Sequence, residues 1–137
     1  MAYEKLSPIT LIAAVQDKVE ILTGLKCYDH VPPNEKSPFY FAELARILPA
    51  NTKTMFRDNF SVAIHCIAEK NQSSVGIYNL IESLQSALSE DIALPEPFEL
   101  VLQTDNGVQA VKTDETGEKH AIVNFDFMVC YGFKCKT

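Results

Sequence analysis

The chain has 137 residues, of which 47% are hydrophobic, and 12 Lys and Arg stand against 18 Asp and Glu, for a net charge of −6. The hydrophobic content excludes a disordered chain, and the length predicts that residues 1–137 form a single domain. No apolar run approaches the roughly 20 residues of a membrane-spanning helix, so we expect no membrane partner. No secretory signal is found at the start of the sequence, so we expect a cytoplasmic protein. No stretch gathers the basic residues, so we expect no specific nucleic-acid binding.

The first predicted element is a helix from Ser7 to about Thr23. Ser7 can cap its first turn, Pro8 is tolerated there because no N–H bond is lost, and Gly24 can end it in the left-handed conformation. Apolar residues recur along one stripe of this segment: Leu11, Ile12, Val15, Val19 and Leu22. Residues 25–31 follow as a short predicted strand that Pro32 and Pro33 stop.

Residues 34–38 are a predicted polar loop, and residues 39–48 are a predicted strand. Helix is the competing reading of residues 39–48, but the aromatic opening Phe39-Tyr40-Phe41 favours a strand. The polar segment 49–58 then predicts an exposed hairpin loop. Because such loops tend to carry contacts, we take this one as the candidate partner-contact site, with residues Asn51, Thr52, Lys53, Thr54 and Arg57.

Residues 59–88 predict a long strand, a short turn and an amphipathic helix. Apolar side chains alternate with polar ones from Phe60 to Glu69, which indicates one buried strand face. Ser73 or Ser74 can cap the helix that follows, whose apolar stripe is Ile77, Leu80, Ile81, Leu84 and Leu88. The acidic, proline-bearing segment 89–97 is a predicted connector.

The last part of the chain predicts extended structure. Residues 98–104 alternate, residues 105–107 form a turn or bulge, and residues 108–112 continue extended. A second turn at residues 114–117 leads into a strand over residues 120–133. Long alternating strands with two helices predict an α+β fold: a mainly antiparallel sheet of four to five strands, with both helices packed on one face.

Thiols and histidines give no metal-site signature. Structural zinc sites need paired ligands at short spacing, whereas Cys130 and Cys135 form an isolated C-x4-C pair. Without a secretory signal the four cysteines are expected to be free and to behave as small apolar residues, Cys27 and Cys66 included. We therefore predict no metal site and no cofactor.

Catalytic arrangements are also missing from the sequence. His65 and Cys66 are adjacent on a predicted strand, so their side chains point to opposite faces and cannot form a dyad. His30 and His120 are interpreted as lone histidines near strand ends. Two carboxylate pairs, Asp29 with Glu43 and Asp114 with Glu115, show no reason to converge on a pocket, so no catalytic residue and no enzyme activity are predicted.

Several segments together resemble the tail-terminator or tail-completion family of long-tailed bacteriophages. They are LIAAVQDKV at 11–19, CYDHVPP at 27–33, SPFYFAEL at 37–44, FSVAIHCIAE at 60–69, GIYNLIESLQSAL at 76–88 and DETGEKHAIVNFDFMV at 114–129. The resemblance covers almost the whole chain and consists of an order of elements, with no catalytic signature. The long polar segment 49–58 replaces a compact turn in this pattern.

The resemblance implies a structural virion protein, assembled in the host cytoplasm and located in the tail. It implies a ring, a hexamer, at the head-proximal end of the tail tube, which ends tube growth and joins the tail to the head. Its partners would be other copies of itself, the tail tube protein and the head connector protein, and DNA would pass through the ring. The open edges of the predicted sheet suit such self-association. Two alternatives stay open: a head-completion or connector adaptor, and a small-molecule-binding or enzymatic α+β domain.

Overall fold

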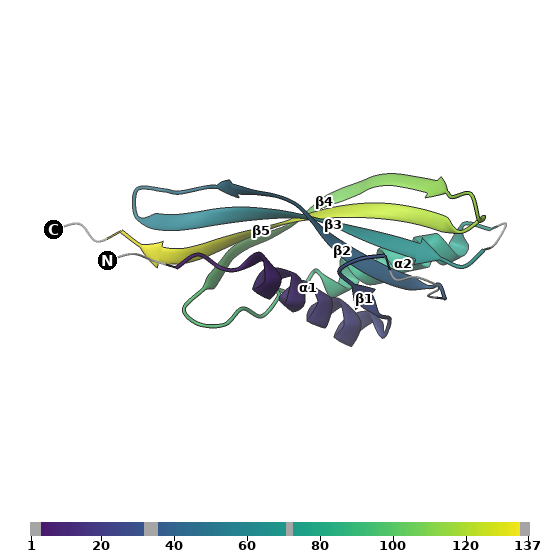
Figure 1. The fold of residues 1–137 in the computed structure, drawn as a ribbon, viewed down its shortest axis with the longest axis horizontal. Coiled ribbons are helices and arrows are strands. Elements are labelled where there is room, and N and C mark those ends of the chain that lie inside the picture. The colour runs from purple at the N-terminus through teal and green to yellow at the C-terminus, as the bar shows by residue number, and fades with distance from the viewer. Residues whose placement is uncertain (1–3, 32–35, 71–72, 135–137) are drawn as a thin grey trace.

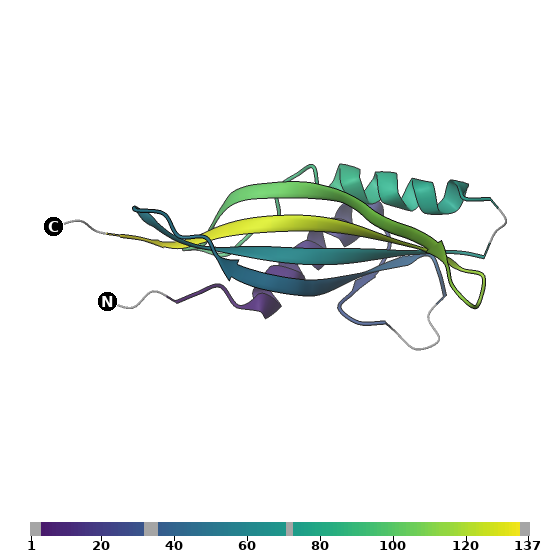
Figure 2. The ribbon, with the colours of Figure 1, turned by 90° about the horizontal axis from the view of Figure 1, so that it is seen from above.

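The computed structural model describes residues 4–31, 36–70 and 73–134. Its elements are α1 (Pro8–Thr23), β1 (Cys27–Tyr28), β2 (Phe39–Pro49), β3 (Met55–Ala68), α2 (Val75–Ala87), β4 (Glu99–Thr113) and β5 (Lys119–Phe133). The strands form one open sheet in the order β1-β2-β3-β5-β4, in which only β1 and β2 are parallel. Both helices cover the same face of this sheet (Figures 1 and 2). The predicted α+β class, with a mainly antiparallel sheet, is confirmed.

Local capping explains where the helices begin and end. The Ser7 hydroxyl accepts a hydrogen bond from Ile9 N at 3.2 Å, and Gly24 ends α1 with φ of 76°. At α2 the Ser74 side chain makes no capping bond, whereas Ser73 Oγ accepts from Val75 N at 3.2 Å. Neither helix in the described ranges has the length and apolar character needed to cross a membrane.

The core lies between the helices and the two central strands. The antiparallel register of β3 and β5 sets Phe60 opposite Phe127 and Ile64 opposite Val123, and all four side chains are buried on the helix-covered face. Leu11, Val15 and Val19 of α1 and Ile77 and Leu84 of α2 pack against them. The alternation read from the sequence therefore identifies the buried face correctly.

The first predicted strand is longer than the observed one. Of residues 25–31 only Cys27–Tyr28 are β1, and side chains of α1 bind the backbone of Cys27: Glu20 Oε2 accepts from Cys27 N, and Gln16 Nε2 donates to Cys27 O, both at 2.9 Å. The predicted stop at Pro32 and Pro33, and residues 34 and 35 of the predicted loop 34–38, lie outside the described residues.

The predicted loop 49–58 is too long. β2 runs to Pro49 and β3 begins at Met55, so the turn occupies only residues 50–54. Backbone bonds from Ala50 N to Arg57 O at 2.8 Å and from Thr52 N to Met55 O at 3.0 Å extend the hairpin. Polar side chains hid this part of the strand, since backbone pairing does not require apolar residues on an exposed ribbon.

Candidate functional site

The predicted contact residues lie at one end of the sheet, at the left of Figure 1, where the β2–β3 turn and the end of β5 meet. We call residues 47–57 and 131–134 the hairpin end. Asn51, Thr52, Lys53 and Thr54 are in the turn, as predicted, but Arg57 belongs to β3, so its assignment to the loop is wrong. The turn is built by its own side chains, because Asn51 Oδ1 accepts from Arg57 N at 2.8 Å and Thr52 Oγ1 accepts from Met55 N at 3.0 Å.

The hairpin end is basic and partly apolar. It contains three cations, Lys53, Arg57 and Lys134, and no carboxylate, in a chain whose net charge is −6. Lys134 Nζ lies 5.1 Å from the centre of the Phe56 ring, which stacks on Tyr131. Three large apolar side chains here are exposed, namely Ile47 (37%), Leu48 (47%) and Phe133 (53%).

A groove flanks the hairpin end on the side of β4. β4 begins at Glu99, opposite Cys130, whereas β5 continues to Phe133, so β5 extends beyond the start of its neighbour. The groove has a volume of about 640 Å³ and is lined by Glu96, Phe98, Glu99, Tyr131, Gly132 and Phe133. Its walls therefore combine aromatic rings with two carboxylates.

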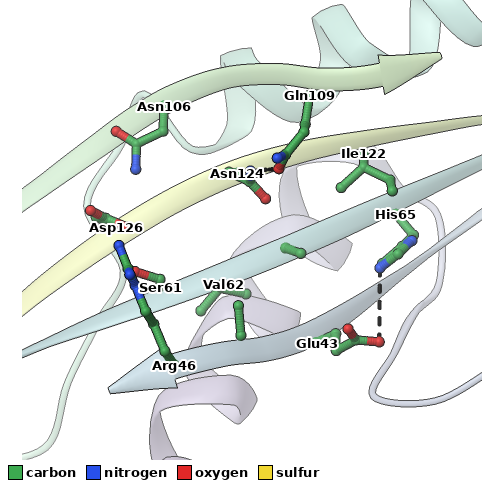
Figure 3. Close-up of a pocket in the computed structure, with 12 residues that line it drawn as sticks. Glu43, Arg46, Ser61, Val62, His65, Asn106, Gln109, Ile122, Asn124 and Asp126 are labelled. Carbon is green, nitrogen blue, oxygen red and sulfur yellow. Dashed lines mark hydrogen bonds and ion pairs between the residues drawn. The ribbon is translucent and has the colours of Figure 1, made fainter. Parts of the chain in front are cut away.

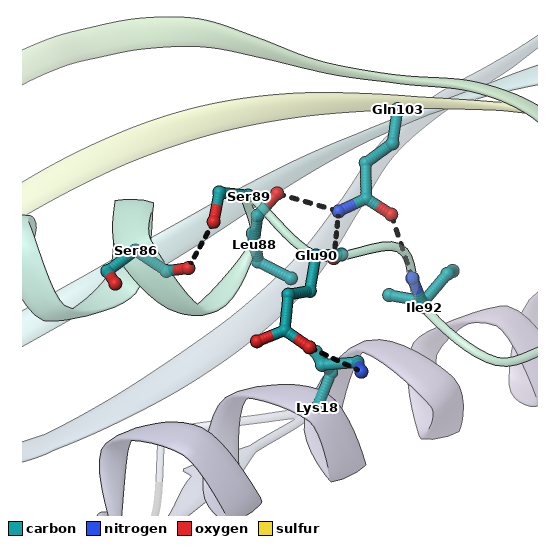
Figure 4. Close-up of polar contacts among 7 residues, drawn as sticks. All are labelled: Lys18, Ser86, Leu88, Ser89, Glu90, Ile92 and Gln103. Atoms are coloured by element: carbon teal, nitrogen blue, oxygen red, sulfur yellow. Dashed lines mark hydrogen bonds and ion pairs between the residues drawn. The ribbon is translucent and has the colours of Figure 1, made fainter.

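Gln103 of β4 fixes the connector that forms one wall of this groove (Figure 4). Its Nε2 donates to Leu88 O and to Glu90 O, both at 2.8 Å, and its Oε1 accepts from Ile92 N at 3.0 Å. Lys18 of α1 adds an ion pair to Glu90 at 3.9 Å. The segment predicted as an irregular connector thus has a defined path.

A second, polar groove of about 380 Å³ lies on the sheet face that the helices leave open (Figure 3). Asp126 lies at one end of it, near Arg46 and Asn106. Partial burial alone would raise the pKa of Asp126, but hydrogen bonds from Ser61, Asn59 and Asn106, together with the charge of Arg46, hold it below its usual value. The lining mixes charged side chains, amides and apolar residues, which suits polar contacts.

His65 and His120 meet on the same open face, which corrects the interpretation of His120 as a lone histidine. His65 Nδ1 lies 2.9 Å from His120 Nε2, and the His65 ring stacks on Phe41 with centroids 4.1 Å apart. Burial, followed by the charge of His120, lowers the pKa of His65, although Glu43, 3.9 Å away, opposes the shift. Burial, followed by the charge of Lys112, lowers the pKa of His120. Both rings are therefore neutral at pH 7.

Of the remaining candidates, Asp29 and Glu43 both line a groove of about 340 Å³ beside α1, so the expectation that they would not converge on a pocket is wrong. Asp114 binds its own turn, accepting from Thr116 N at 2.9 Å and Glu118 N at 3.0 Å. Cys27 and Cys66 are buried thiols, and burial raises the pKa of each to about 12. Across residues 4–31, 36–70 and 73–134 no group of three or more His, Cys, Asp or Glu is arranged to hold a metal ion.

The sequence could not reveal the histidine pair, the role of Gln103 or the groove beside β5. Each of these features depends on strand register, and β4 shifts register against β5 at three places. An excess of cations between residues 53 and 57, followed by acidic residues at 96 and 99, was the one available signal of the hairpin end and its groove.

Comparison with known proteins agrees with the fold. A chain of the solved structure "Virion of native gene transfer agent (GTA) particle" has the same fold, with a TM-score of 0.71 and 19% identity over 93% of this chain and 99% of that chain. No curated protein matches the sequence. Residues 2–137 match the family Phage_tail_terminator_4, described as "Putative tail termination protein". The chain therefore belongs to this tail-termination family, and it is a structural protein of the virion tail.

Proposed function

We propose that the protein forms a hexameric ring at the head-proximal end of the tail tube, where it ends tube growth and joins the tail to the head. The proposal extends the family membership to a specific place in the particle. Its partners there are other copies of itself, the tail tube protein and the head connector protein. We propose no enzymatic activity, because the family is one of tail-termination proteins and the sequence carries no catalytic motif.

The observation that carries the proposal is the open sheet with two different edges. β4 forms one edge along its whole length, and on the other side β1 covers only Tyr40 and Phe41 of β2. A contact between one kind of edge and a different surface of the next copy is heterologous, and heterologous contacts form a ring when the rotation between copies closes. Exposed edges are otherwise a liability that proteins cover or blunt.

The charge of the protein suits a ring through which DNA passes. With a net charge of −6 the protein repels phosphates on average, and the groove on the open sheet face contains two carboxylates, Glu43 and Asp126, beside one arginine, Arg46. Firm DNA binding would require several basic side chains along one surface.

Tube growth in solution tests this proposal. Tail tube protein from the same particle is polymerised with increasing amounts of this protein, and tube lengths are measured by electron microscopy. We expect the mean length to fall as the protein is added, because capped ends stop growing. Tubes of unchanged length at excess protein would refute a role in termination.

A further inference from the structure

We propose that the β2–β3 hairpin of each copy, residues 47–57 of the hairpin end, seats in the groove beside β5 of a second copy, and that this contact joins neighbouring copies in the ring. The inference rests on the proposed function and specifies the surface that such a ring would use. It assigns the predicted contact residues to a partner, namely the next copy of the same chain.

The topology places the two surfaces on opposite sides of β3. On one side, β2 continues to Pro49 after β1 has ended opposite Phe41; on the other, Tyr131 and Gly132 lie past the start of β4. A contact between these two sides leaves the opposite side of each copy ready for another neighbour, so it repeats around a ring. β2 and β5 are each antiparallel to β3, and both run toward the hairpin end (Figure 1). Neighbouring copies with aligned hairpin ends therefore present parallel edges.

The two surfaces match in charge. The hairpin supplies Lys53 in the turn and Arg57 in β3, and the groove supplies the carboxylates of Glu96 and Glu99. No ion pair recorded for the described ranges engages Lys53, Glu96 or Glu99 within the same copy. Opposite charges across an interface steer association and fix its register.

They also match in apolar character. Ile47 and Leu48 are exposed on β2, and the groove offers the rings of Phe98 and Tyr131. Burying these side chains removes apolar surface from water, while the charged pairs remain at the rim. Gln103 holds the first part of the connector that leads into the groove, and the ring of Tyr131 stacks on Phe56 of the same copy.

Charge reversal with complementation tests the contact. The variants are Lys53→Glu and Glu99→Lys, with Lys26→Glu and Glu115→Lys as matched controls at exposed positions away from the hairpin end and its groove. Each variant is mixed with preformed tail tubes, and the fraction of capped ends is counted by negative-stain microscopy. Like charges replace opposite ones in either variant alone, so we expect capping to fall by at least about tenfold at limiting protein. Both controls should cap as the wild type does.

An equal mixture of the two variants is the decisive sample. In an alternating hexamer, the new carboxylate of the Lys53→Glu copy faces the new ammonium of the Glu99→Lys copy, so this contact again pairs opposite charges. The other contact in this hexamer joins the native Lys53 of the Glu99→Lys copy to the native Glu99 of the Lys53→Glu copy. Capping of the tube ends should therefore return. Recovery also shows that both variants are folded, and circular dichroism confirms this for each one alone.

The outcomes separate the two proposals. If the wild type caps tubes and both variants cap equally well, the contact is wrong and the proposed function stands. If the variants fail and their mixture also fails, the hairpin end binds the tube protein instead of a second copy, and the contact is again overturned. A wild-type protein that neither forms rings nor caps tubes overturns both proposals.

Discussion

Lys134 Nζ donates a hydrogen bond of 2.8 Å to the carbonyl oxygen of Thr52, which ties the end of β5 to the β2–β3 turn. The Lys134→Met variant keeps the aliphatic stem but removes this bond and the cation above Phe56. We expect faster hydrogen exchange at the amides of Thr54 and Met55 and a loss of about 1 kcal/mol in the free energy of unfolding. Lys26→Met serves as the control. Unchanged exchange in the turn would show that Lys134 does not hold it.

Gln103→Ala removes three hydrogen bonds to the connector at once. At roughly 0.5–1.5 kcal/mol for each bond, we expect urea denaturation to show a loss of about 2–3 kcal/mol, with faster proteolysis within residues 89–97. Gln109→Ala is a control on the same strand, because the Gln109 side chain contacts Asn124 on the open face and not the connector. Equal stability losses in the two variants would contradict this role of Gln103.

The histidine pair predicts a pH dependence of stability. Because the folded-state pKa values of His65 and His120 lie below the ordinary value of 6.5, the unfolded chain binds more protons once the pH falls below about 6.5. The free energy of unfolding should therefore fall as the pH is lowered from 7.5 to 5. The charge of Glu43 opposes the lowering of the His65 pKa, and the charge of Asp114 opposes the lowering of the His120 pKa. The charge of Lys112 lowers both pKa values.

Two substitutions test this source of the pH dependence. His120→Gln should reduce the slope of the profile between pH 7.5 and 5, whereas Gln109→Ala, which removes no titratable group, should keep the wild-type slope. Chemical denaturation across this range supplies the profile. An unchanged slope in His120→Gln would assign the effect to other groups.

Thiol reactivity tests the burial of Cys27 in β1 and of Cys66 in β3. Since burial raises the pKa of Cys27 and Cys66 to about 12, neither forms the reactive thiolate at pH 8. We expect iodoacetamide, followed by mass spectrometry, to leave both thiols unmodified in the native protein and to modify both in urea. Rapid labelling of either thiol without denaturant would mean that the strand carrying it opens readily.

Sequence patterns were sufficient for elements whose cause is local or periodic. Ser7 and Gly24 mark both ends of α1, and the alternation around Val62 and Ile64 identifies the buried face of β3. The same alternation around Phe125 identifies β5 and, with the two helices, gives the fold class.

Features that depend on tertiary contacts could not be read in the same way. β1 is held by side chains of α1 that bind the backbone of Cys27, and β3 begins early because the hairpin continues through polar residues. The meeting of His65 with His120 and the groove beside Tyr131 require the register of β5 against two neighbours. Only the charge of Lys53 and Arg57 pointed to the hairpin end from the sequence.

The most direct test of the central claim is the location and size of the protein on isolated tail tubes. Purified protein is mixed with preformed tubes and imaged by negative-stain microscopy, and its native mass is measured by light scattering before and after mixing. The account predicts a ring-shaped cap at one end of each tube, with the mass of a hexamer. A protein that stays monomeric and leaves both tube ends bare would contradict it.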